Sequence, residues 1–117
     1  MPFGCTRINF NSVTQSAVLA VGHPCYLVAA RGFTTAGTEV FIQFFDANAT
    51  SGITVGTTVP DWVLDIVAGS ANGSVSVGDG VPSNGLRFDN GIVIAATGGS
   101  TTNTAPTGTV YVRLGIQ

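Results

Sequence analysis

The run TVYVRLGI at residues 109–116 places an aliphatic side chain at every second position. Side chains alternate between the two faces of a β-strand, so a period of two predicts a strand with one apolar face. The aliphatic positions are Val110, Val112, Leu114 and Ile116. Tyr111 and Arg113 fall on the other face. This pattern, and not a helical period, is the main constraint on the fold of the chain.

The same alternation recurs along the sequence, and helical periodicity is hard to find. Further candidate strands are residues 7–10, 16–21, 25–31, 39–46, 62–67, 74–77, 86–88 and 92–96. Turn dipeptides that accept positive φ separate several of them, namely Asn72-Gly73, Asp79-Gly80, Asn84-Gly85 and Asn90-Gly91. The segments 7–10, 74–77 and 86–88 are short pieces, and we expect about seven or eight short antiparallel strands in all. Without intervening helices, they predict an all-β domain, a jelly-roll-like β-sandwich. A small closed barrel is the alternative.

The 117-residue length is sufficient for one domain and too short for two. We therefore expect a single β-sandwich domain over residues 1–117, with residues 1–10 as a candidate extended N-terminal arm. Two long loops, 70–85 and 96–107, are rich in small and polar residues. Loops of that length in a compact domain tend to be functional contacts or mobile.

The stretch Phe41-Ile42-Gln43-Phe44-Phe45 is apolar on both faces if it forms a strand. Its second face needs a cover, either a loop of the same chain or another protein. Charged residues make up 9% of the chain, against roughly 25% in ordinary globular domains, and lysine is absent. A surface with so few charges favours association, so we expect a homo-oligomer, specifically a homotrimer.

The four arginines stand singly along the sequence among six acidic residues, and the net charge is −2. This spacing shows no basic stripe, so neither nucleic-acid binding nor salt-sensitive assembly is expected. No apolar run reaches the roughly 20 residues of a membrane helix, and the N-terminus does not resemble a signal peptide. We expect that the protein is made in a cytoplasm and that it does not associate with a membrane. A reducing compartment favours free thiols at Cys5 and Cys25 over a disulfide.

Candidate catalytic and metal-binding residues are few, and each has a simpler structural interpretation. His23 precedes Pro24 at a strand entrance, without a serine-hydrolase motif. Acid pairs suited to glycoside hydrolysis would be Asp61 with Asp65, or Asp79 with Asp89. Asp79-Gly80 and Asp89-Asn90-Gly91 could supply oxygen ligands to calcium, but the spaced acids of an EF-hand are absent. Aspartates beside glycine or asparagine, or at the end of a strand as Asp46 is, more often cap turns. We therefore predict no catalytic, cofactor-binding or metal site, no cofactor and no enzyme activity.

Aromatic residues leave a second possibility open. Exposed aromatic rings act as sugar platforms in lectin-like sandwiches, and Trp62, Tyr26 and Tyr111 are available. Packing in the core is the commoner fate of aromatic residues at strand positions and is favoured here.

Several stretches resemble a group of small virion proteins of tailed bacteriophages. They are FIQFFDA at 41–47, VGTTVP at 55–60, GIVIAAT at 91–97 and Ala105-Pro106 before the last strand. These motifs occur in an order similar to that of the phage group, from about residue 40 to residue 117. Residues before 40 contribute nothing to the likeness.

This resemblance implies a non-catalytic structural protein located in the virion and assembled in the host cytoplasm. Its most specific implication is a capsid decoration (cement) protein, a homotrimer that binds the major capsid protein of the assembled head. A tail, neck or fibre component, or a glycan-binding module of the virion, is the alternative. The resemblance carries no catalytic or metal residue to this chain.

Overall fold

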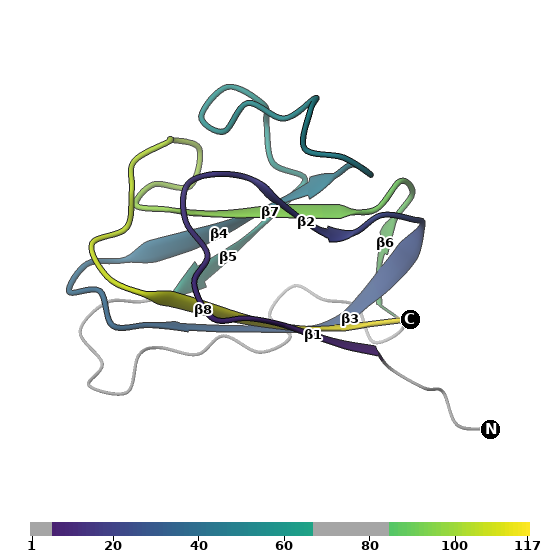
Figure 1. Ribbon diagram of the computed structural model, residues 1–117, viewed down its shortest axis with the longest axis horizontal. Coiled ribbons are helices and arrows are strands. Elements are labelled where there is room, and N and C mark those ends of the chain that lie inside the picture. The colour runs from purple at the N-terminus through teal and green to yellow at the C-terminus, as the bar shows by residue number, and fades with distance from the viewer. Residues whose placement is uncertain (1–5, 67–84) are drawn as a thin grey trace.

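The computed structural model describes residues 6–66 and 85–117, which form eight β-strands in two four-stranded sheets (Figure 1). The strands are β1 (Thr6–Phe10), β2 (Val18–Val21), β3 (Cys25–Thr34), β4 (Val40–Asp46), β5 (Trp62–Ile66), β6 (Leu86–Phe88), β7 (Ile92–Thr97) and β8 (Val110–Ile116). All the strand pairs are antiparallel. The prediction of an all-β sandwich is confirmed. The candidate strand at 74–77 lies outside the described residues.

The strand order identifies the sandwich as a jelly roll. Sheet A has the order β1-β8-β3-β6 and sheet B the order β2-β7-β4-β5. The first strand pairs with the last, β2 with β7, β3 with β6, and β4 with β5. This nesting is that of one long hairpin, and rolling the hairpin up adds the pairs β3–β8 and β4–β7.

The main core lies between the two sheets. Phe44 is fully buried there, and its ring centroid lies 4.9 Å from that of Trp62 and 6.5 Å from that of Phe88. The alternation expected in the C-terminal run is confirmed, because its aliphatic residues belong to this core. They are Val110, Val112, Leu114 and Ile116. Burial of these apolar side chains is the main source of stability.

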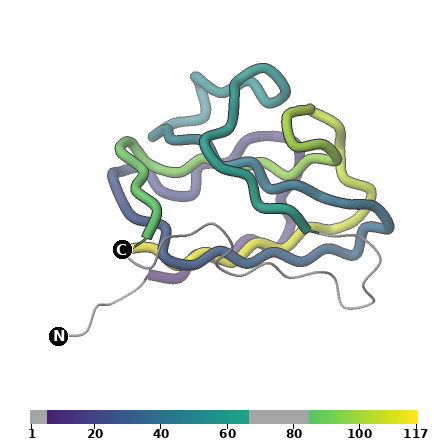
Figure 2. Tube along the Cα trace, turned by 180° about the vertical axis from the view of Figure 1, so that it is seen from behind, coloured from purple at the N-terminus to yellow at the C-terminus, as the bar shows by residue number. Residues whose placement is uncertain are grey.

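A second, smaller core lies on the outer face of sheet B. Phe45, Val93 and Ala95 are buried there beneath residues of the β4–β5 loop, including Ile53 and Val55. This loop, residues 47–61, lies over sheet B in both views (Figures 1 and 2). The chain therefore covers the second face of the 41–45 stretch with its own loop, and no other protein is required for that purpose.

The expectation that residues 1–10 extend from the domain as an arm is wrong for residues 6–10. They form β1, whose register with β8 pairs Arg7 with Gly115 and Phe10 with Val112. The following link crosses from one sheet to the other, because Val13 N–H donates to a carbonyl of β8 and a carbonyl of the link accepts from Ala96 in β7. Backbone hydrogen bonds thus hold this segment against the sandwich. Residues 1–5 lie outside the described part of the chain.

Candidate functional site

All four arginines project from the outer face of sheet A, one from each strand. They are Arg7 on β1, Arg31 on β3, Arg87 on β6 and Arg113 on β8. Their neighbours along each strand turn inward to the core, and this alternation directs every arginine outward. We call this surface the arginine face. Because the chain has no lysine, all of its lysine and arginine charge is on this one surface.

The arginines are therefore separate in the sequence but gathered on one surface of the fold. In the register of sheet A, Arg31 lies directly opposite Arg113, and Arg7 lies opposite Gly115, two residues further along β8. Directly opposite Cβ atoms in such a ladder are about 5 Å apart, and diagonal ones about 7–8 Å. Each arginine does occupy the polar position of an alternating strand, which the sequence shows. The sequence does not show which four strands share a sheet.

Arg87 has a charge partner on the arginine face. Its Nε lies 3.1 Å from Asp89 Oδ1, and its guanidinium lies 5.0 Å from the ring centroid of Tyr26. The hydrogen bond to Asp89 raises the pKa of Arg87 above its ordinary value. Both partners are exposed, so this pair adds little to stability but compensates one of the four positive charges.

Arg113 is held in place by three acceptors. Its Nη1 donates to the Phe10 carbonyl at 2.8 Å and to the Val112 carbonyl at 3.2 Å, and its Nη2 donates to Asn11 Oδ1 at 2.9 Å. These acceptors are neutral, so they do not offset the positive charge of the guanidinium. Among residues 6–66 and 85–117, neither Arg113 nor Arg7 nor Arg31 forms an ion pair.

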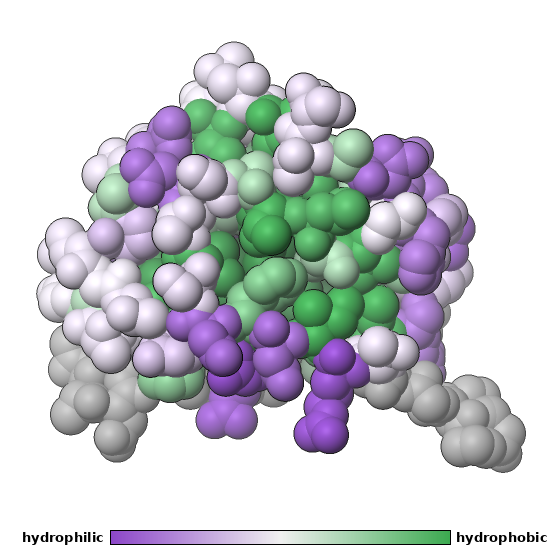
Figure 3. Space-filling view, viewed as in Figure 1, coloured by the Kyte–Doolittle hydropathy of each residue, from purple (hydrophilic) through white to green (hydrophobic). Residues whose placement is uncertain are grey.

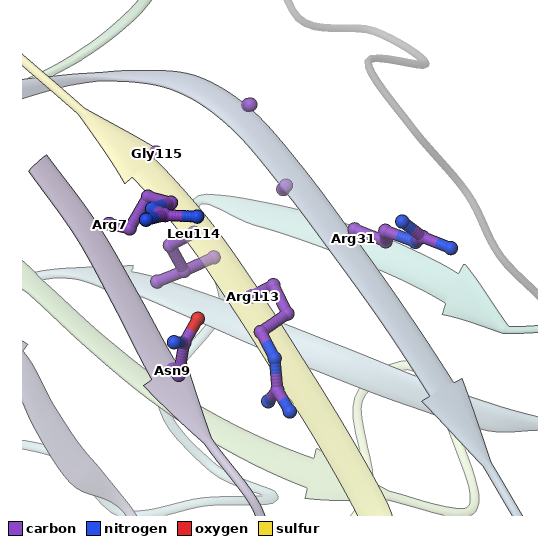
Figure 4. Close-up of a pocket in the computed structure, with 8 residues that line it drawn as sticks. Arg7, Asn9, Arg31, Arg113, Leu114 and Gly115 are labelled. Carbon is purple, nitrogen blue, oxygen red and sulfur yellow. The ribbon is translucent and has the colours of Figure 1, made fainter. Parts of the chain in front are cut away.

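A depression of about 320 Å³ lies among these three arginines (Figure 4). Arg7, Asn9, Arg31 and Arg113 line it together with Ala29, Ala30, Leu114 and Gly115. In Figure 4 Arg7 lies across β8 toward β3, whereas Arg31 extends beyond β3 on the far side. The small residues Ala29 and Gly115 pair across β3 and β8 and leave the space between the arginines open.

A second pocket, of about 460 Å³, lies beside the loop that covers sheet B. The β1–β2 link, the β4–β5 loop and the β7–β8 loop contribute to it. Its lining residues are Gln15, Ser16, Ala17, Thr50, Ile53, Thr54, Val55 and Asn103. The polar members carry hydroxyl and amide groups without charge, which suits a neutral ligand rich in hydroxyl groups.

The three aromatic residues considered for glycan binding do not form one site. Trp62 packs against the core between the sheets, as the core interpretation predicts. Tyr26 is 40% exposed on sheet A beneath Arg87. Tyr111 is half-buried and stacks on Phe33, with ring centroids 4.4 Å apart. None of the three lines the uncharged pocket.

The acid pair of Asp61 and Asp65 does not have the geometry for glycoside hydrolysis. Asp61 precedes β5 and Asp65 lies within it. An extended backbone would place their Cα atoms about 13 Å apart, farther than the roughly 9.5 Å expected between two catalytic carboxyl groups. Asp61 Oδ2 instead accepts the backbone N–H of Asp46 at 2.7 Å. Asp65 approaches Glu39, and the hydrogen bond between them raises the pKa of Glu39.

The prediction that Asp46 caps a turn is confirmed. The turn that it caps is the one that begins at Asp89, between β6 and β7. The carboxylate of Asp46 accepts the backbone N–H groups of Asp89 and Asn90 at 3.1 and 2.8 Å. Asp46 therefore stabilises the β6–β7 turn. Asp79, the other member of the second acid pair, lies outside the described residues.

His23 is exposed, and its Nδ1 lies 3.0 Å from the Pro24 carbonyl oxygen. Within 6–66 and 85–117, no three histidine, cysteine, aspartate or glutamate residues gather in a way that could hold a metal ion. The same ranges contain no helix long and apolar enough to cross a bilayer. Cys25 is a free thiol buried in the core, and burial raises its pKa. Cys5, the other cysteine of the chain, lies outside these ranges.

Comparison with protein-family models, with curated proteins and with solved structures finds no match for this chain.

Proposed function

We propose that this protein is a non-catalytic structural component of a tailed-phage virion, most specifically a capsid decoration protein. It binds the major capsid protein of the assembled head from outside and stabilises the shell. The observation that carries this proposal is the arginine face. A small jelly roll that places all four of its arginines on one sheet has a single, chemically distinct surface with which to attach to a larger partner.

The motifs behind the phage resemblance have structural positions in the fold. FIQFFDA spans β4, GIVIAAT spans β7, and VGTTVP belongs to the loop that covers them. β4 and β7 are neighbouring central strands of sheet B. These motifs build the second core and contribute no arginine. Their likeness to the phage proteins therefore concerns how the domain is built and not how it contacts a partner. The arginine face on the opposite sheet then supplies the contact with the partner.

We also propose that the protein is a homotrimer, but the structural argument for a trimer differs from the one based on the sequence. The apolar second face of β4 is covered within the chain, so it no longer argues for a partner copy. Partly exposed apolar residues remain on the edge strands β1 and β2, with Leu19 41% exposed. Figure 3 shows hydrophobic residues gathered in the middle of the face on which these strands lie. A trimer would bury this edge and leave the arginine face free.

The direct test is the location and copy number of the protein in purified particles. A decoration protein is present in proportion to the capsid lattice, so quantitative mass spectrometry should find many copies for every tail. Adding purified protein to particles that lack it should raise their rupture temperature, because a ligand of the assembled state stabilises that state. A few copies per particle, or an unchanged rupture temperature, contradicts the proposal.

A glycan-binding module of the tail or fibre is the second candidate, and the uncharged pocket favours it. Hydroxyl and amide groups from three loops surround apolar side chains, an arrangement that can bind a neutral sugar. Saturable binding to neutral glycans, lost on substitution of Asn103 and Thr54 by alanine, would support this function. A few copies per particle would agree with it.

A further inference from the structure

We propose that the depression on the arginine face binds acidic side chains of a partner protein, with Arg7, Arg31 and Arg113 as the charge-bearing contacts. The inference rests on the proposed function for its premise that the partner is a protein. It adds the chemistry of that partner: glutamate or aspartate carboxylates carried on an exposed segment.

Charge is the first reason. Three arginines without an ion-pair partner in the described part of the chain line one depression, mainly with the apolar part of their side chains, in a protein whose net charge is −2. The fourth arginine, Arg87, is compensated by Asp89. Guanidinium groups can bind carboxylates in a bidentate manner, with two parallel charge-assisted hydrogen bonds.

The fixed position of Arg113 is the second reason. Its bonds to Phe10, Val112 and Asn11 orient the guanidinium before any ligand arrives. A pre-positioned group loses less conformational entropy on binding than a free side chain does. Arg7 and Arg31 are exposed, so their side chains can turn toward the ligand, Arg31 from the far side of β3 (Figure 4).

The size and lining of the depression favour an acidic side chain over a nucleic-acid backbone. The three arginines lie within two residues of one another on adjacent strands, so the charge is compact and does not form a long stripe. Nucleic-acid sites extend their positive charge along many phosphates. Ala29 and Gly115, with the aliphatic stems of the arginines, offer apolar contact for the methylene groups of a glutamate.

The arginine face also changes the expected salt dependence of assembly. Scattered arginines predicted weak sensitivity to salt. Three arginines at one contact, none with an ion-pair partner within 6–66 and 85–117, predict the opposite. Exposed charge pairs are screened over about 8–10 Å at physiological ionic strength. Binding through the depression should therefore weaken several-fold between low and moderate salt.

The test is calorimetric titration of the full-length protein with an end-blocked hexaglutamate peptide at low salt. Hexaglutamine, inorganic phosphate and a single-stranded thymidine hexamer serve as comparison ligands. We expect saturable binding of hexaglutamate, no binding of hexaglutamine, and weaker binding of phosphate and the thymidine hexamer. The double substitution Arg7→Gln with Arg31→Gln should weaken hexaglutamate binding about ten-fold, which is what losing two charge-assisted contacts implies.

Arg87→Gln is the control, because it removes one positive charge from the same sheet but outside the depression. It should change the affinity for hexaglutamate less than about two-fold if the contact is local. Arg113 is left unchanged, since its bonds to β1 could couple its loss to folding. Circular dichroism melts should show all variants folded.

Absence of hexaglutamate binding at low salt overturns the proposal, as does an equal loss in the Arg87 variant. Tighter binding of the thymidine hexamer than of hexaglutamate also overturns it in favour of a nucleic-acid surface. These results are independent of particle location. A protein that is abundant in virions but does not bind hexaglutamate would refute the acidic contact and leave the decoration function intact. Hexaglutamate binding by a protein that is absent from virions would support the acidic contact and refute the decoration function.

Discussion

Gln43 on β4 donates its side-chain amide to the hydroxyl of Thr97 on β7, at 2.8 Å in the buried outer layer of sheet B. The same amide nitrogen lies 3.0 Å from the Thr102 carbonyl and 3.3 Å from that of Gly99. Thr97 Oγ1 in turn donates to the Gly99 carbonyl at 2.6 Å. Two side chains from adjacent strands thereby hold the start of the β7–β8 loop against the sheet.

The first prediction follows from this network. Gln43→Ala removes the donor from buried or partly buried carbonyls and leaves a cavity, so it should lower the free energy of unfolding by about 2–4 kcal/mol. Urea denaturation measures the change. Gln117→Ala is the control, because that side chain is exposed at the end of the chain and should contribute less than about 0.5 kcal/mol. Equal effects at the two glutamines would contradict a structural role for the network.

The second prediction concerns Gly91 in the β6–β7 turn. Its φ is +150°, and a Cβ atom there would press against the carbonyl oxygens of Val21 and Ala47. Gly91→Ala should therefore destabilise the protein by about 2 kcal/mol or more, through backbone strain and steric overlap.

Gly37→Ala is the control for this substitution. It lies in open space without positive φ, so alanine should be neutral there or slightly stabilising. Thermal melts of both variants make the comparison. A tolerated alanine at 91 would contradict the close approach of the turn to its neighbours.

The third prediction is that Cys25 resists thiol reagents until the protein unfolds. The thiol is 2% exposed, and burial raises its pKa, so both access and thiolate fraction are low. In a Cys5→Ser background, labelling should be slow in buffer and fast in denaturant.

The sign of the Cys25 shift also sets a pH dependence. A raised pKa in the folded state favours folding while the thiol is neutral, and this contribution is lost as pH rises through the folded-state value. Folded protein should therefore stay unreactive as pH passes the usual thiol pKa of about 8.5. Rapid labelling at neutral pH without denaturant would show that residue 25 is accessible.

The fourth prediction concerns the carboxylates of Glu39 and Asp65. Their hydrogen bond raises the pKa of Glu39, so its stabilising contribution is present below the usual glutamate pKa and is lost as pH rises through the folded-state value. The melting temperature of the wild type relative to Glu39→Gln should therefore fall as pH increases from about 3 to 6. In an Asp65→Asn background this dependence should disappear. A difference that is constant with pH would show that the two groups do not interact.

The fifth prediction addresses the proposed trimer. Sedimentation at micromolar concentration should give a species three times the mass of the chain. Leu19→Asp places a charge on the apolar edge of β2 and should shift the protein toward monomer, because burying an unpaired charge in an interface is costly. Val59→Asp is the control, since Val59 is 80% exposed on the β4–β5 loop. A wild-type monomer would refute the trimer, and dissociation by both substitutions would refute the β2 edge as its interface.

The arginine face marks the limit of what could be predicted about the candidate site. That Arg113 lies on the polar face of a strand was evident from the alternation in residues 109–116. That Arg7, Arg31 and Arg87 join it on one surface depends on which strands pair, and this pairing is set by contacts between residues far apart in the chain. The phage location and the partner remain proposals.

The sequence by itself determined the all-β class, most of the strands and the apolar faces that meet in the core, because a period of two and local turn chemistry are short-range properties. The tertiary structure decided the pairing order, the enclosure of Phe45 by the chain's own loop and the grouping of the four arginines. The physical reason is that strand registry and loop placement minimise the free energy of the whole sandwich. No local pattern specifies which distant segment a given strand will meet.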